Sequence, residues 1–269
     1  METARMHGLD KVLFCGDTHA DFSFLQGALG ILRPSVCIVA GDFGYWRRSD
    51  FEEGAGEGFF HEGLRHPGTR IFFCDGNHEN HALLRRLVET RGWEKPIHVA
   101  PGLFYAPRGS TAVIRGRRVL FAGGAFSIDR AYREEGRTWF AEEEMGQEEL
   151  ERILKRSDLD SVDAVVSHTC PAGCLDKVCG ICGLKPEWIS GRATEDALER
   201  IFQRLPRVRD WYFGHWHCAG SFVRRGVRFH LLNQTPGEGC LAGWGYRRET
   251  LEQAQAGAMG ALQASGGPG

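Results

Sequence analysis

Metal-binding residue types follow five short apolar runs of this chain, and this arrangement strongly constrains how it can fold. In chain order the clusters are GDTHAD (Asp17, His19), GDFG (Asp42), GNHE (Asn77, His78, Glu79), SHTC (His168) and GHWH (His215, His217). Four of them directly follow KVLFC, SVCIVA, RIFFC and DAVVS, which have the composition of buried strands, and the fifth follows RDWYF. Such residues at strand ends indicate a site assembled from distant parts of the chain.

Helical patterns separate the strand-like runs in the first half of the chain. We expect helices near residues 22–32, 59–65 and 81–91. Strands that alternate with helices predict βαβ units and largely parallel pairing. Ligands of such sheets bind outside the carboxyl ends of the strands, and the five clusters would lie there.

The second half of the chain mixes hairpins with helices. The patterns predict strands at 97–99, 111–115, 118–121, 220–223 and 227–232, and helices at 142–156 and 193–203. Past about residue 249 the sequence is mostly Ala, Gln and Gly, and we expect it to be frayed. The predicted organisation is an N-terminal extension (1–10), one domain (11–248) and a disordered tail (249–269).

Composition excludes several classes of protein. A net charge of −2 over 269 residues gives no strongly basic surface for long nucleic acids. The N-terminus has no apolar signal region, and no apolar run has the length of a membrane span. The cysteine count is nine, and Cys15, Cys37 and Cys74 lie in strand-like runs, which favours free thiols in a reducing compartment. We expect a soluble cytoplasmic protein with no membrane partner.

The five clusters, in this order, resemble the motifs of the calcineurin-like metallophosphoesterases over residues 11–233. The resemblance implies an α/β fold, a four-layer αββα sandwich of two mixed sheets flanked by helices. It also implies a metal-dependent phosphoric ester hydrolase with two divalent ions and an attacking, metal-bridging hydroxide. Mixed imidazole and oxygen donors suit manganese, which we favour, and also iron, zinc, cobalt or nickel.

The resemblance also assigns roles to individual residues. By similarity, the first metal is bound by Asp17, His19 and His217, the second by Asn77, His168 and His215, and Asp42 bridges the two. His78 would be the general acid that protonates the leaving alkoxide. Glu79 is expected to have a structural role.

The chain departs from one branch of the family at Tyr45. In the serine/threonine phosphatases, the residue three positions after the bridging aspartate is a second aspartate that orients the catalytic histidine. Purple acid phosphatases have a tyrosine there as a metal ligand, but they lack the histidine of the D-x-H motif, which is His19 here. We expect Tyr45 to lie beside the ligands without binding metal, and the residue that orients His78 stays open.

An arginine in the segment GGAFSIDR is a candidate for substrate binding. Arg130 lies just past a strand end, where a guanidinium could contact a phosphate oxygen through two hydrogen bonds. The alternative is a solvated loop, in which case Arg47 and Arg48 are the next candidates.

Four cysteines lie within thirteen residues directly after the SHTC motif. Cys170, Cys174, Cys179 and Cys182 form the pattern C-x3-C-x4-C-x2-C. This spacing suggests an additional structural zinc site, and the alternative is four reduced thiols.

The function favoured by the sequence is a dinuclear metal-dependent phosphoesterase acting on a phosphate monoester or diester. The expected substrate is a phosphorylated small molecule or a nucleotide, because the short chain leaves little room for a large specificity domain. One alternative is a serine/threonine phosphoprotein phosphatase, which Tyr45 weakens. The other is a catalytically inactive metal-binding scaffold, although such proteins usually lack ligands that this chain has.

Overall fold

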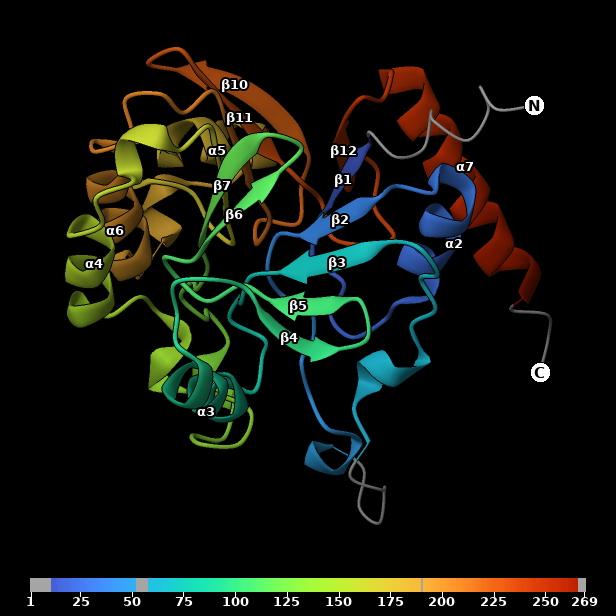
Figure 1. The fold of residues 1–269 in the computed structure, drawn as a ribbon, viewed down its shortest axis with the longest axis horizontal. Helices are drawn as coiled ribbons and strands as arrows, with labels where there is room; N and C mark the ends of the chain where they lie inside the picture. The colour runs from blue at the N-terminus through green and yellow to red at the C-terminus, as the bar shows by residue number, and fades with distance from the viewer. Residues whose placement is uncertain (1–10, 52–57, 190, 266–269) are drawn as a thin grey trace.

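Two six-stranded sheets face each other in the computed structural model, which describes residues 11–51, 58–189 and 191–265 (Figure 1). The first sheet has the order β12 (Leu241–Trp244), β1 (Val12–Cys15), β2 (Val36–Val39), β3 (Arg70–Phe73), β5 (Leu103–Tyr105) and β4 (Ile97–Ala100). The second has the order β10 (Gly220–Arg224), β11 (Val227–Leu231), β9 (Asp210–Phe213), β8 (Ala164–Ser167), β7 (Arg117–Ala122) and β6 (Thr111–Ile114).

Both sheets have a parallel centre and antiparallel edges. In the first sheet β1, β2, β3 and β5 pair in parallel, whereas β12 and β4 pair antiparallel at the two edges. In the second sheet β11, β9, β8 and β7 are parallel, and β10 and β6 form the antiparallel edges. All parallel strands of a sheet therefore end at one edge, as the sequence predicted.

Alternating side chains of each strand fill two different layers of the core. In β1, Val12 and Phe14 belong to the hydrophobic cluster between the two sheets. Leu13 and Cys15 belong to the cluster under the first sheet, between this sheet and its helices. The Phe14 ring stacks on Tyr212 of β9 and so joins the two sheets. Because β1 and β9 are buried on both faces, each consists of a nearly continuous run of apolar residues.

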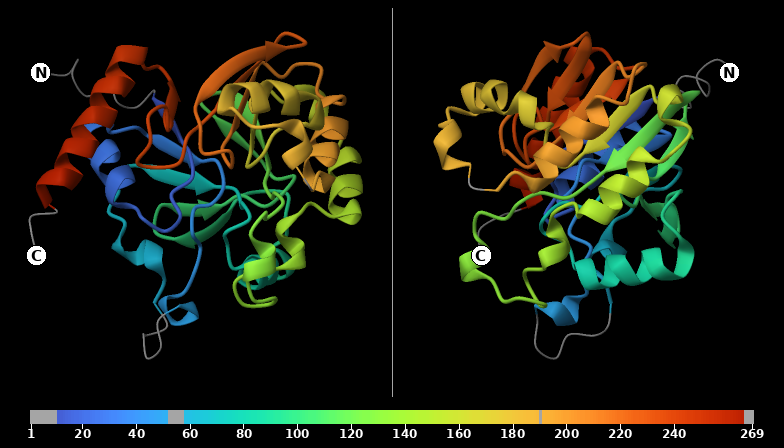
Figure 2. Two further views of the ribbon diagram at one scale, coloured as in Figure 1. Left: turned by 180° about the vertical axis from the view of Figure 1, so that it is seen from behind. Right: turned by 90° about the vertical axis from the view of Figure 1, so that its left-hand side faces the viewer.

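Helices cover the outer faces of the sheets and complete the predicted αββα sandwich (Figure 2). They are α2 (Ser23–Leu32), α3 (His81–Arg91), α4 (Gln147–Leu154), α5 (Leu175–Cys182), α6 (Ala193–Phe202) and α7 (Arg248–Ser265). Residues of α2 and α7 pack on the first sheet, and residues of α4, α5 and α6 pack on the second. None of the helices in the described part of the chain qualifies as a candidate membrane span.

Two predicted helices are shorter than the sequence suggested. The helix expected at 59–65 is a 3₁₀ turn, Phe60–Gly63. The helix expected at 142–156 begins only at Gln147, because the preceding residues form a separate turn that carries Glu143 into the protein interior.

The predicted disordered tail was wrong for residues 249–265, which belong to α7. Ala254 and Ala258 are buried in the cluster under the first sheet, and α7 lies beside α2 (Figure 1). Small residues allow this close approach, since a Cβ on Gly27 of α2 would lie 3.3 Å from the Cβ of Ala258. Alanine is also the best helix former, so a composition that resembles a flexible tail suits a docked helix. The predicted extension at 1–10 lies outside the described residues.

We predict that Ala258→Leu destabilises the protein by about 1–3 kcal/mol, because the larger side chain has no space at the α2–α7 contact. The matched control is Ala256→Leu, the same substitution at an exposed position of α7, which should change stability by less than about 0.5 kcal/mol. Urea denaturation measures both. Equal effects of the two variants would show that α7 is not docked in solution.

Candidate metal centre

The five sequence clusters meet where parallel strands of the two sheets end. Asp17 and Asp42 follow β1 and β2, Asn77 follows β3, and His168 follows β8 directly. The loop after β9 adds His215 and His217. Each cluster therefore reaches the centre because its own strand ends there.

Three sets of side chains have donor atoms that all lie within 4.8 Å of one another. These sets are Asp17, His19 and His217; His19, Asp42 and His78; and Asp17, Asp42 and His168. Each set combines carboxylate and imidazole donors, and each could hold a metal ion.

The two remaining predicted ligands lie against these sets. The amide oxygen Oδ1 of Asn77 is 3.1 Å from Nε2 of His168. The His215 ring centroid is 5.0 Å from that of His168, and its backbone N–H donates to Oδ2 of Asp17 at 3.0 Å. All seven predicted ligands thus gather in one place.

The charges of this centre suit a divalent cation. Burial raises the pKa of the Asp42 carboxyl, but His168, His78 and His19 together outweigh burial and hold that pKa well below its usual value. Burial disfavours protonation of His168, yet Asp42 and Asp17 overcome it and raise its pKa to about 10. Burial lowers the pKa of His215 to about 3, which keeps this imidazole neutral. His168 thus carries a proton that a bound divalent cation would displace, whereas His215 is neutral. Buried anionic oxygens beside imidazoles are a donor set that first-row transition metals prefer.

The backbone holds several of these residues in the left-handed region, which side chains other than glycine rarely adopt. The φ angles are 45° at His19 and Asp42, 71° at His215 and 47° at His217. Backbone N–H groups of Thr18 and His19 donate to the Asp42 carbonyl at 3.0 and 2.8 Å and hold the two loops together. Such conformations persist only where the surrounding structure imposes them, and they concentrate at functional sites.

A backbone contact orients His168. Its Nδ1 lies 2.9 Å from the carbonyl oxygen of Ala40, which suits an Nδ1–H donor. Nε2 then faces Oδ2 of Asp42 at 3.2 Å. Metal-binding histidines are typically held by such a second hydrogen bond.

A buried relay orients the Asn77 amide. Its Nδ2 donates to Oγ of Ser127 at 3.0 Å, and Ser127 donates to the Glu143 carboxylate. With the nitrogen held in this way, Oδ1 faces His168 and the centre. Neither Ser127 nor Glu143 lies in a recognisable motif, so the sequence did not single them out.

Glu79 has the structural role that we expected. Its buried carboxylate accepts hydrogen bonds from the backbone N–H groups of Gly44 at 3.2 Å and Gly76 at 2.7 Å. It therefore ties the loop of Asp42 to the loop of Asn77. A side chain at Gly76 would collide with Asp42, which explains why this close approach requires glycine.

A cavity of about 510 Å³ opens beside the centre. The residues that line it are His19, Ala20, Asp21, Gly44, Trp46, Phe51, Phe60, His78, Asp129, Arg133 and Thr138. The His78 backbone is held on two sides, because its N–H donates to Oδ1 of Asp42 and its carbonyl accepts from Nε1 of Trp46, each at 2.7 Å. This contact with Trp46 was not evident from the sequence.

Arg133, and not Arg130, lines this cavity. Arg130 is exposed, and its guanidinium lies over the Phe126 ring, 4.7 Å from the centroid. The chain turns through a 3₁₀ segment at Arg130–Tyr132, which brings Arg133 inward to Oγ of Ser127 at 2.8 Å and to Glu143 at 3.2 Å. The sequence identified the loop, but only the path of the backbone decides which arginine turns inward.

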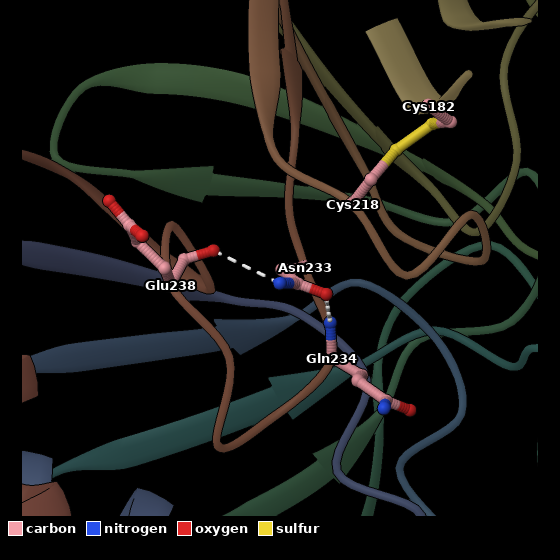
Figure 3. The surroundings of a disulfide bond; sticks show 5 residues. All are labelled: Cys182, Cys218, Asn233, Gln234 and Glu238. Carbon is pink, nitrogen blue, oxygen red and sulfur yellow. Dashed lines mark hydrogen bonds between the residues drawn. A yellow bond between two sulfur atoms is a disulfide. The ribbon is translucent and has the colours of Figure 1, made fainter.

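One of the four clustered cysteines pairs outside the cluster, which differs from the arrangement that a four-cysteine zinc site requires. Cys182, at the end of α5, forms a disulfide with Cys218, and the Cα atoms are 5.8 Å apart (Figure 3). Cys170, Cys174 and Cys179 are free and buried. In the part of the chain that the structure describes, no metal-binding group of three side chains includes a cysteine. The spacing was misleading because Cys182 pairs with a residue of the distant GHWH loop.

The thiols in the strands lie where we expected, whereas Tyr45, which we expected beside the ligands, lies in the hydrophobic core. Cys15, Cys37 and Cys74 are free and buried. Tyr45 packs in the hydrophobic cluster, with its ring centroid 5.4 Å from that of His61 and 5.6 Å from that of Phe73.

The sequence matches the family model of calcineurin-like phosphoesterases over residues 10–219, which is most of the chain. The chain belongs to this family. No curated protein matches it. A solved crystal structure with 16% identity and a TM-score of 0.53 is similar over 87% of this chain and 94% of its own, which supports the fold.

Two further solved structures are more distant. Phosphopantetheinyl hydrolase from Mycobacterium tuberculosis has 12% identity and a TM-score of 0.44, with 89% of this chain and 98% of that one covered. A conserved uncharacterized protein from Streptococcus pneumoniae TIGR4, described as a predicted phosphoesterase, has 9% identity and a TM-score of 0.32, with coverages of 84% and 72%. These two likenesses add nothing to the assignment, and the family alone identifies this chain as a phosphoester hydrolase.

Proposed function

We propose that this protein is a dinuclear metal-dependent phosphoesterase that hydrolyses a small phosphate monoester or diester. The observation that carries the proposal is the convergence of two buried aspartates, four histidines and Asn77 at one edge of the sandwich. Family membership supports hydrolysis of a phosphoester, and the donor chemistry supports metal dependence.

The ligand assignment follows the family motifs. We assign Asp17, His19 and His217 to the first metal, Asn77, His168 and His215 to the second, and Asp42 as the bridge. The contacts support the bridge, because Oδ2 of Asp42 is 3.8 Å from Nε2 of His19 and 3.2 Å from Nε2 of His168. Two divalent ions there, with manganese favoured, would lower the pKa of a bound water and neutralise phosphoryl charge.

The remaining chemistry belongs to residues of the cavity. His78 is placed to donate a proton to the leaving oxygen, since it lines the cavity next to His19 and its backbone is fixed by Asp42 and Trp46. Arg133 adds a positive charge on the same cavity, where it would attract the phosphate.

Neither alternative function gains support from these contacts. Tyr45 lies in the hydrophobic core and supplies no carboxylate to His78, in contrast to the serine/threonine phosphatases. An inactive scaffold does not require the complete donor set that is present here. A cytoplasmic location stays a prediction.

Asp42→Asn should remove metal-dependent hydrolysis of p-nitrophenyl phosphate and bis-p-nitrophenyl phosphate, because an amide cannot bridge two cations as a carboxylate does. The substitution is conservative for the backbone, since asparagine tolerates the φ of 45° at this position. Turnover assays across a metal panel, with metal analysis of the variant, test this, and Asp160→Asn on the surface is the control. Wild-type protein inactive on both esters with every metal would refute the proposed function.

His78→Ala should keep its metals and lose about 10²–10⁴-fold in rate on alkyl phosphates, the usual contribution of a positioned proton donor. The loss should be smaller for p-nitrophenyl phosphate, whose leaving group needs less protonation. His98→Ala, at an exposed position in β4, should behave as wild type. Equal losses on the two kinds of ester would argue against proton donation by His78.

Arg133→Ala should lower kcat/KM by about tenfold to a hundredfold, the effect expected when a charged hydrogen-bond donor is lost. Arg130→Ala is the matched control and should change kcat/KM by less than about twofold, because Arg130 lies outside the cavity. The opposite order of effects would restore Arg130 as the substrate-binding residue.

A further inference from the structure

One side of the cavity is a wall of three aromatic rings that the proposed chemistry does not use. We call Trp46, Phe51 and Phe60 the aromatic wall. The Phe51 ring makes an edge-to-face contact with each of the other two, with its centroid 4.9 Å from that of Trp46 and 6.1 Å from that of Phe60. Phe51 keeps 52% of its surface exposed, although a large apolar side chain gains free energy from burial.

The wall is fixed by backbone contacts. Trp46 and Phe60 lie on two segments joined by an antiparallel bridge between Arg47 and Phe59. The Phe60 N–H donates to the carbonyl of Trp46 at 3.2 Å, and the Arg48 N–H donates to the carbonyl of Gly58 at 2.8 Å. The backbone that carries Trp46 and Phe60 is therefore held in place before any ligand binds.

A second set of contacts ties the wall to α3. The Asp50 carboxylate accepts from the Arg47 N–H and from the Asn80 side chain, each at 3.0 Å. Asn80 in turn caps α3, which follows directly after the GNHE motif. The wall and His78 consequently keep a fixed relation to each other.

The wall extends from the reacting end of the cavity. Trp46 contacts the His78 backbone through its indole N–H, and Phe51 is the next ring beyond Trp46. Polar groups of Asp21, Asp129 and Thr138 line the same cavity. A ligand with its phosphate at His78 would therefore share one cavity with these polar side chains and with the Phe51 ring.

Resting on the proposed phosphoesterase function, we infer that the substrate is a phosphate ester whose organic part carries a flat aromatic ring that stacks on the aromatic wall. A nucleotide has this chemistry, because its sugar separates the phosphate from the base and offers hydroxyl groups. Stacking on aromatic side chains is strong and tolerates different bases. An aryl phosphate differs, since its ring is joined directly to the phosphate oxygen with no sugar between them.

The test compares adenosine 5′-monophosphate with ribose 5-phosphate, which share the same leaving oxygen and differ by the base. In Mn²⁺, wild-type kcat/KM should be about tenfold or more higher for the nucleotide, in the range that base stacking gives. Phe51→Ala should bring the ratio of the two values close to one, and Phe51→Tyr should largely keep it. Tyr132→Ala, which removes an exposed aromatic side chain outside the cavity, should leave the ratio unchanged. If only diesters react, the methyl esters of the same two compounds replace them.

Three outcomes separate the possibilities. A wild-type ratio near one, or a ratio that Phe51→Ala does not change, overturns the inference while the phosphoesterase function stands. Hydrolysis of phenyl phosphate that depends on Phe51, without such dependence for the nucleotide, would assign the wall to an aryl ester and also overturn it. If no ester is hydrolysed, the proposed function fails, and fluorescence titration of wild type and Phe51→Ala with both compounds still decides whether the wall binds the base.

Discussion

The close approach of two buried carboxylates, Asp17 and Asp42, is the constraint on which this structure depends. Both side chains are almost completely buried, and like charges in such a place are costly unless opposite charge is near. His168 lies against both, 3.9 Å from Asp17 and 3.2 Å from Asp42. Packed cores avoid two buried carboxylates side by side. We therefore interpret the surrounding fold as a support that holds the two charges together so that they can bind cations.

The fold provides that support through backbone contacts and not through side chains alone. The loops after β1 and β2 are joined by N–H groups that donate to the Asp42 carbonyl, and Glu79 joins the loops after β2 and β3. Glycine is needed where these loops touch the ligands, since a side chain at Gly41 would collide with the His168 ring. The left-handed conformations at the ligands are thus imposed by many contacts that form together.

The sequence predicted the parts of the site that depend on local pattern. Asp17, Asp42 and His168 each follow a strand that can be recognised from its own residues, and parallel pairing then brings the strand ends together. Contacts between distant segments were not predictable in this way. The inward position of Arg133 includes a contact with the Asn77 carbonyl at 3.4 Å, Cys182 pairs with Cys218, and α7 docks on α2. Each of these depends on a partner far along the chain. Composition alone could not distinguish the alanine-rich α7 from a flexible tail.

A buried ion pair outside the motifs connects the fold to one ligand. Arg108 is almost fully buried and contacts the Asp75 carboxylate at 2.7 Å, just before the GNHE motif. The same guanidinium donates to the carbonyls of Glu142, Glu143 and Glu144 and so fixes the turn that carries the Glu143 side chain inward. Glu143 holds Ser127, which holds the Asn77 amide. A charged group in the interior is costly. The hydrogen-bond donors of Arg108 set the orientation of Asn77, a proposed metal ligand, through a chain of several contacts. This role accounts for the place of Arg108 in the core.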